Sequence, residues 1–244
     1  MAPLPPPPPL DAFLPAERRL IRRLTTPARV QAWLNALPYN HEPRPPGETL
    51  RSFRDVVRRG TAHCLEAALA AAVLLEQHGY PPLLLSFESI DQLEHVIFAY
   101  RARGRWGAVA RSRDPGLHGR TPVFGTARAM AESYFDPYVD KTGCITAFAV
   151  VDLRTTMGTY DWRFSPKNVW KVEQMLIDYP HTKLPVDWAR ERWLRRRYVA
   201  FVEAYPGRKP LQYAGREKWS DLPREYTRPG YEKGWPEGAP DRKK

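Results

Sequence analysis

Cysteine is scarce in this sequence, with only Cys64 and Cys144 among 244 residues. Two cysteines cannot form a disulfide framework, and free thiols are typical of a reducing compartment. The chain must therefore be stabilised by a hydrophobic core, for which its 43% hydrophobic and 12% aromatic content is sufficient. Its length corresponds to one substantial domain or two small ones.

Long hydrophobic runs and cofactor motifs are also missing. The most apolar stretch, about residues 65–75, contains Glu66 and is too short to cross a bilayer. No basic segment precedes an apolar one near Met1, so we expect no secretory signal and a cytoplasmic protein. The glycine-rich loops of nucleotide-binding proteins are absent, and Cys64, His95 and His118 lack the close spacing of zinc ligands. We therefore predict no cofactor, no bound metal and no contact with a membrane.

Negative charge is the scarcer sign, with 27 acidic residues against 38 Lys and Arg and a net charge of +11. Such a balance can indicate a nucleic-acid or acidic protein partner. However, the arginines are spread along the whole chain, which favours a generally solvated surface. Only residues 190–197 concentrate them, with five arginines close to Trp193 and Tyr198. Nucleic-acid binding therefore stays an alternative, and the sequence does not define the oligomeric state.

The periodicity of apolar residues predicts an α+β fold, in which helices precede antiparallel strands. Helices are predicted over residues 16–24, 27–37, 50–57, 62–78, 126–134, 165–177 and 186–204. Strands are predicted over 83–87, 94–101, 106–110 and 144–153, and Gly79 is expected to end its helix in a left-handed conformation. We divide the chain into a proline-rich tail (1–10), a main domain (11–180) and a basic helix with an irregular extension (181–244).

Cys64 lies where a polar turn ends and the most apolar helix begins. Gly60 ends the preceding segment, and Thr61 can cap the helix. The positive end of the helix dipole favours a thiolate over a thiol, and the thiolate is the nucleophilic form. The alternative is an inert cysteine, since free cysteines are commonly buried.

His95, at the start of the predicted strand 94–101, is the candidate partner of Cys64. Histidine can take the thiol proton while a third polar group accepts its other N–H. His63 is a second candidate base, although adjacent residues at a helix start are expected to point in different directions. Glu66 is expected to be a satisfied polar group of the first turn, with a place in the lining of the cleft as the alternative. His118 lies in a loop rich in Gly and Pro.

An ordered set of motifs resembles the transglutaminase-like superfamily, which shares a papain-like core. The set consists of Gly60 to Leu69, the helix ending at 78–82, the strand His95 to Tyr100, and Trp106 after a turn. It covers about residues 49–116. The resemblance implies a central cysteine-bearing helix packed on an antiparallel sheet, with extra helices at both ends. It also implies cysteine-dependent acyl transfer on an amide or peptide bond, as a hydrolase or a transamidase with a protein or peptide substrate.

The third catalytic residue departs from the family pattern. An aspartate usually follows the aromatic residue by four positions, where this chain has Ala110. The nearest aspartate is Asp114, about 13 Å further along an extended strand, so a bulge or bend must bring it back. The resemblance thus predicts a catalytic set of Cys64, His95 and Asp114, with Ser112 as an alternative to Asp114. The other hypothesis is an inactive member of the fold that binds an acidic protein or nucleic acid.

Overall fold

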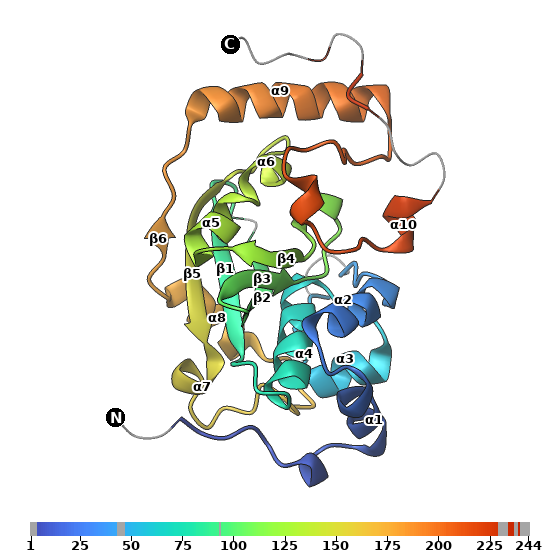
Figure 1. Ribbon diagram of the computed structural model, residues 1–244, viewed down its shortest axis with the longest axis vertical. Coiled ribbons are helices and arrows are strands. Elements are labelled where there is room, and N and C mark those ends of the chain that lie inside the picture. Colours follow the sequence, from blue (N-terminus) through green and yellow to red (C-terminus); the bar gives the residue numbers. More distant parts are fainter. Residues whose placement is uncertain (1–3, 43–46, 93, 229–233, 237–238, 240–244) are drawn as a thin grey trace.

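The computed structural model describes residues 4–42, 47–92, 94–228, 234–236 and 239. Within them, six strands form one antiparallel sheet in the order β4-β3-β2-β1-β5-β6, which confirms the α+β class (Figure 1). In chain order the strands are β1 Leu83–Ser89, β2 His95–Ala102, β3 Arg105–Val109, β4 Arg120–Phe124, β5 Ile145–Asp152 and β6 Thr182–Lys183.

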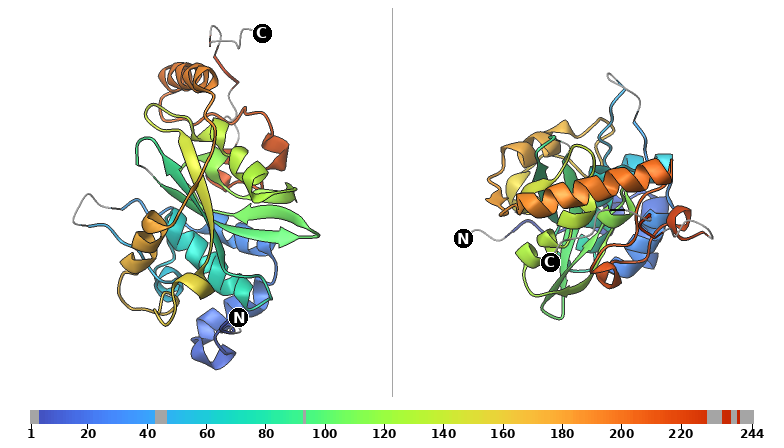
Figure 2. Two further views of the ribbon diagram at one scale, coloured as in Figure 1. Left: turned by 90° about the vertical axis from the view of Figure 1, so that its left-hand side faces the viewer. Right: turned by 90° about the horizontal axis from the view of Figure 1, so that it is seen from above.

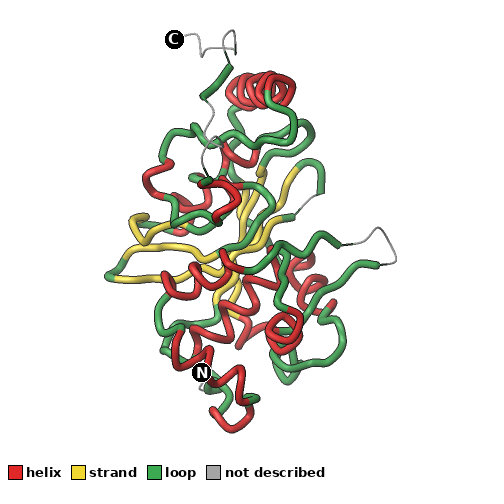
Figure 3. The backbone as a smooth tube through the Cα atoms, turned by 90° about the vertical axis from the view of Figure 1, so that its right-hand side faces the viewer, coloured by secondary structure: helices red, strands yellow, loops and turns green. Residues whose placement is uncertain are grey.

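Helices lie on both sides of this sheet (Figure 3). The first four are α1 Pro15–Arg23, α2 Pro27–Ala36, α3 Phe53–Arg59 and α4 Cys64–Glu76. They are followed by α5 Ala127–Glu132, α6 Phe135–Tyr138, α7 Leu153–Thr156, α8 Trp170–Asp178, α9 Trp188–Ala204 and α10 Arg224–Thr227. Helix α9 lies across the end of the molecule opposite α1 (Figure 2). No helix in the described part of the chain has the length and apolar character needed to span a membrane.

The alternation of side chains along the strands divides the core into two layers. Leu84 and Phe98 pack in one cluster with the helices α2, α3 and α4. Their neighbours Leu85 and Ile97 pack in the other cluster, with α5 and α6. Both faces of the central strands β1 and β2 are therefore buried, as a two-sided core requires.

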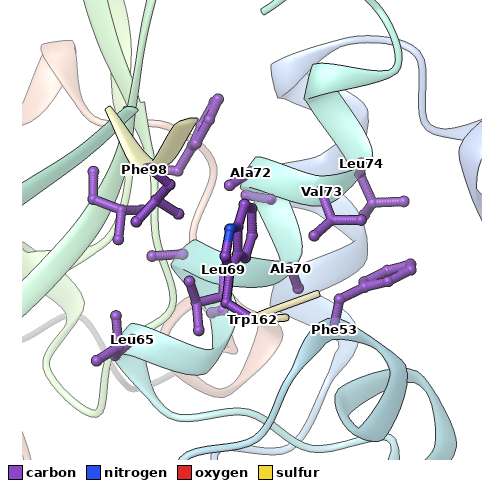
Figure 4. Close-up of a cluster of buried hydrophobic side chains, with 14 of the residues drawn as sticks. Phe53, Leu65, Leu69, Ala70, Ala72, Val73, Leu74, Phe98 and Trp162 are labelled. Carbon is purple, nitrogen blue, oxygen red and sulfur yellow. The ribbon is translucent and has the colours of Figure 1, made fainter. Parts of the chain in front are cut away.

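Helix α4 is the central helix of the fold. Every residue of the helix from Leu65 to Glu76 is buried, and Cys64 at its start is partly exposed. Leu69 belongs to one buried cluster with Phe98 of the sheet and Trp162, and all three are almost completely buried (Figure 4). Each large apolar side chain buried in this way contributes about 1.5–3 kcal/mol to stability. This burial fixes the position of the helix end that carries Cys64.

Three helix starts differ from the prediction because the expected capping hydroxyls have other partners. The Thr49 hydroxyl donates to Glu66, and α3 begins only at Phe53. Thr61 accepts from the Arg51 guanidinium, so α4 begins after His63. A local turn around Ser165, whose hydroxyl accepts from the backbone N–H of Lys167, delays α8 to Trp170. Gly79, at φ +83°, confirms the expected left-handed ending.

The chain after residue 206 is more ordered than its composition predicted. It contains α10 and the 3-10 helix Arg216–Lys218. Leu211, Trp219 and Tyr226 form a small buried cluster there. Strand β4 was also not predicted, and Trp219 forms an isolated bridge with its first residue, Arg120.

Candidate active site

Glu66 determines how the chain enters the helix that begins with Cys64. His63 is the N-cap, and its backbone N–H donates to the Glu66 carboxylate at 3.0 Å. Three further donors reach this fully buried carboxylate: the backbone N–H of Arg51, the Thr49 hydroxyl and the Asn40 amide. Glu66 is thus the satisfied polar group that the sequence predicted, and it holds the segment before Cys64 in place.

His95 is the first residue of β2 and is held in a fixed orientation. Its ring stacks on Phe87 with an interplanar angle of 5°. Its Nε2 lies 2.9 Å from the backbone carbonyl oxygen of Leu117. A carbonyl can only accept, so Nε2 carries the hydrogen and Nδ1 is left with its lone pair. The hydrogen bond between His95 and Cys64 therefore uses Nδ1, which is free to take the thiol proton.

Cys64 lies between two imidazoles. Burial raises the pKa of its thiol, but hydrogen bonds from His63 and His95, together with their charges, bring that pKa well below the usual value. Burial also opposes the charged form of His63, yet the bond to Cys64 and the Glu66 carboxylate raise the pKa of His63 to about 9. The thiolate and a protonated His63 therefore stabilise each other at neutral pH.

The sequence predicted that His63 and Cys64 point in different directions, but the His63 side chain is hydrogen-bonded to Cys64. As N-cap it has an extended backbone, with φ −89° and ψ −174°, so the directions of consecutive helical residues do not apply to it. Its Nε2 donates to the Thr49 carbonyl at 3.0 Å, which leaves the other nitrogen for Cys64. The signal in the sequence was a histidine at the N-cap position directly before the cysteine, with Glu66 three residues later.

Asp114 and Ser112 do not occupy the place beside His95 that the resemblance gave to a third residue. The Asp114 carboxylate pairs with Lys209 at 2.6 Å, and the Ser112 hydroxyl accepts from the backbone N–H of Asp114. Instead, the chain bends after β3 into the 3-10 helix Pro115–Leu117, which brings the Leu117 carbonyl to His95. The Leu117 carbonyl thus accepts the N–H of His95, as the aspartate expected at position 110 would have done.

The loop that carries this carbonyl is fixed by Arg120. The guanidinium is completely buried and donates to the carbonyls of Gly116 at 2.7 Å and His118 at 3.0 Å. The Cζ atom of the guanidinium lies over the ring of Tyr134, 3.7 Å from the ring centroid. Burial lowers the pKa of Arg120 to about 10, so it is still charged at neutral pH. His118, predicted to lie in a loop, is buried, and its pKa is well below the usual value.

A cleft of about 730 Å³ opens onto Cys64. It is lined by the start of α4, the start of β2, the loop after β3, α8 and Tyr198 of α9. Tyr39 also lines it and is hydrogen-bonded to the backbone of Cys64. Among the described residues, no group of three or more His, Cys, Asp and Glu side chains is arranged to hold a metal ion.

Replacing His63 by glutamine should raise the pKa of Cys64 by about 1–3, since the variant removes a cation next to the thiolate. The pKa can be measured from the thiolate absorbance near 240 nm as the pH is lowered. The exposed His41 provides a matched control, and His41→Gln should leave the titration unchanged. A His63→Gln variant that titrates like the unmodified protein would show that the His63 charge does not act on Cys64.

No family model and no curated protein sequence matches this chain. Three solved structures of Legionella pneumophila LapG are similar in part. The first is 12% identical with a TM-score of 0.34, and the similarity covers 62% of this chain and 90% of that one. The EGTA-treated form is 11% identical (TM-score 0.36, 69% and 92% covered), and the calcium-bound form is 13% identical (TM-score 0.35, 68% and 94% covered).

Proposed function

We propose that this protein is a cysteine-dependent acyl-transfer enzyme that acts on an amide or peptide bond. The observation that carries the proposal is the placement of Cys64 at a helix start, at the mouth of a cleft and between two imidazoles. The depressed pKa of the Cys64 thiol supports a nucleophilic role, because the thiolate is the attacking form.

In the first half of the reaction the Cys64 thiolate, whose proton has already passed to His95, attacks the carbonyl carbon of the substrate. A carbon–sulfur bond forms while the carbonyl π electrons move onto oxygen. We assign the stabilisation of this oxyanion to the backbone N–H of Cys64 and to the Tyr39 hydroxyl, which are hydrogen-bonded to each other at the mouth of the cleft. When the oxyanion collapses, the carbon–nitrogen bond breaks, and His95 gives its proton to the leaving amine.

In the second half His95 removes a proton from the acceptor, which attacks the thioester and releases Cys64. Water as acceptor gives hydrolysis, and an amine gives transamidation. The Leu117 carbonyl holds the His95 ring in one tautomer throughout, as the third member of a triad does in other enzymes. Because a carbonyl is neutral, it stabilises the charge of the His95 imidazolium less than a carboxylate would. The neighbouring Cys64 thiolate is the main counter-charge of that imidazolium.

The alternative of a non-catalytic module that binds nucleic acid or an acidic protein has less support. Arg190 of α9 pairs with Asp136 at 2.7 Å, Arg195 pairs with Glu191, and Arg197 stacks on Trp193. These contacts indicate that much of the arginine-rich helix serves the fold. The cleft itself is rich in carboxylates, which would repel phosphate groups.

The proposal is tested by trapping the thioester. The protein is incubated with a mixture of peptides of all compositions, quenched in acid and analysed by intact mass spectrometry. We expect an acyl adduct on Cys64 together with cleaved or transamidated peptides. Cys144→Ala should retain both products, because Cys144 is buried and its pKa is raised to about 11. Cys64→Ala should lose both. The absence of adduct and product in the unmodified protein would contradict the proposal.

A further inference from the structure

The charge of the cleft is opposite to that of the whole chain. Although Lys and Arg outnumber acidic residues by 38 to 27, the described residues that line the cleft include one arginine and seven carboxylates. These carboxylates are Glu42, Glu48, Asp91, Glu94, Asp114, Asp140 and Glu173. The single arginine, Arg113, is itself 3.6 Å from one of them, Asp114. In the described part of the cleft, carboxylates therefore outnumber the cations Arg113 and His63, although the protein carries a net charge of +11.

Several of these carboxylates have their charge already balanced. Asp114 pairs with Lys209, and the Asp140 carboxylate accepts from the backbone N–H groups of Thr142 and Gly143. Glu42 accepts from the backbone N–H of Thr49. These residues are accounted for by the fold, and they do not need a ligand.

Three other carboxylates of the cleft lack such a partner. Among the residues that the structure describes, Glu48, Glu94 and Glu173 have no ion-pair partner. Glu94 and Glu173 are half-buried, and burial raises the pKa of each. They also repel one another, because the charge of Glu173 raises the pKa of Glu94. Half-buried carboxylates that repel each other are costly in an empty cleft, and a cation between them would relieve the cost.

These carboxylates are close to the reacting atoms. Glu94 directly precedes His95. Glu173 on α8 is close enough to His63 for the imidazolium charge to offset part of the rise that burial causes in the pKa of Glu173. The Cys64 charge raises the pKa of both glutamates. Two chain segments thus present unpaired carboxylates within electrostatic range of the nucleophile. The site itself is the cleft, and the carboxylates decide which charge it accepts.

We propose that the cleft selects peptide segments that carry lysine or arginine next to the amide bond that Cys64 attacks. This inference rests on the proposed function and specifies its substrate class. Lysine and arginine side chains form strong charge-assisted hydrogen bonds with carboxylates, and the low dielectric of a partly enclosed cleft strengthens them. A cleft volume of about 730 Å³ is within the range of sites that enclose most of a small ligand.

The charge preference can be measured without any turnover. Three methanethiosulfonate reagents are used to modify Cys64: a trimethylammonium-ethyl cation, a sulfonate-ethyl anion of similar size, and a smaller, neutral methyl form. The rate for the cation is divided by the rate for the anion, and this ratio is normalised to that of a free thiol at pH 7 and low salt. We expect a normalised ratio on the order of tenfold or more, which falls as salt is added. Cys144 does not contribute, because it is buried.

The double variant Glu94→Gln, Glu173→Gln should lower this ratio by at least about threefold, since it removes two charges and keeps the side-chain size. Its rate with the neutral reagent reports whether the site is still folded. The control Glu132→Gln removes one charge from an exposed position of α5 outside the cleft and should leave the ratio unchanged. A normalised ratio near one, or a ratio that the double variant does not change, would overturn the inference.

Failure of this inference can be distinguished from failure of the proposed function. If peptides are cleaved but the ratio is near one, the proposed acyl transfer is correct and the proposed preference for cationic segments is wrong. If the ratio is high and no thioester is ever trapped, the cleft binds cationic segments without acyl transfer. The thiol reagents need only an accessible Cys64, so the two experiments do not depend on each other.

Discussion

Replacing His95 by alanine should reduce the rate of acyl transfer by about 10²–10⁴-fold, the usual contribution of a general acid and base. His95 holds the proton that the Cys64 thiolate has lost and later donates it to the leaving amine, and the second imidazole hydrogen-bonded to that sulfur is His63. His63 cannot substitute for it, because its pKa of about 9 keeps it protonated at neutral pH. The measurement is kcat/KM with any peptide found by thioester trapping.

Added imidazole provides the control for this variant. Because His95 is buried, His95→Ala leaves a cavity beside Cys64 that an imidazole molecule can enter. Partial recovery of turnover with imidazole, absent in Cys64→Ala, would show that the lost group acted as a base. If His95→Ala kept more than about a tenth of the activity, the assignment of His95 as the base would be wrong.

Replacing Arg120 by methionine should destabilise the protein by about 1–3 kcal/mol, the usual cost of leaving a buried polar group without its hydrogen-bond partner. The variant leaves the buried carbonyl of Gly116 without its donor, and an unsatisfied carbonyl costs about 1–3 kcal/mol. The His118 carbonyl loses one donor but keeps the Tyr134 hydroxyl. Because the Leu117 carbonyl lies between these residues, we expect turnover to fall as well. Urea unfolding followed by tryptophan fluorescence gives the free energy of unfolding.

Arg128→Met provides the matched control for this prediction. Arg128 is on α5 and its side chain is 42% exposed. Its contacts are long: an ion pair with Glu132 at 3.9 Å, hydrogen bonds of 3.4 Å to the Lys183 carbonyl, and the ring of Phe148 at 5.7 Å. Its replacement should change the free energy of unfolding by less than about 0.5 kcal/mol. A loss of less than about 1 kcal/mol in Arg120→Met would show that Arg120 does not fix the loop that holds His95.

Local patterns were sufficient to predict the parts of the site that lie at the ends of regular elements. The apolar residues of α4 and the glycine after it predicted a buried helix beginning near Cys64. The alternating residues of β2 placed His95 at the start of a strand. Both predictions depend on contacts that repeat every few residues, and the sequence shows such repeats directly.

The orienting group of His95 could not be predicted in this way. Every residue has a carbonyl, so nothing in the sequence distinguishes that of Leu117. The position of the Leu117 carbonyl depends on the bend after β3 and on Arg120. Arg120 is buried, whereas an arginine in a sequence is normally expected at the surface. The partner of Asp114, Lys209, lies far away in the chain, and no local pattern links the two.

The extension after α9 also contributes to the site through contacts that its composition did not indicate. Glu225 pairs with the buried Arg111 at 3.0 Å, and the Tyr226 hydroxyl donates to the Arg113 carbonyl at 2.7 Å. Both partners belong to the loop between β3 and the 3-10 helix that presents the Leu117 carbonyl. A segment rich in proline, glycine and charge was predicted to be irregular, yet it packs against this loop.

The central claim is that Cys64 is a thiolate at neutral pH, and the pH dependence of its alkylation by iodoacetamide tests this directly. Since the pKa of the Cys64 thiol is depressed, the thiolate persists as the pH falls until that lowered pKa is reached. A free thiol with a pKa of about 8.5 would react at pH 6 at only about 1/300 of its maximal rate. The account predicts that alkylation of Cys64 is already near its maximum at pH 6–7. A rate that instead rises between pH 8 and 9, as for a free thiol, would contradict it.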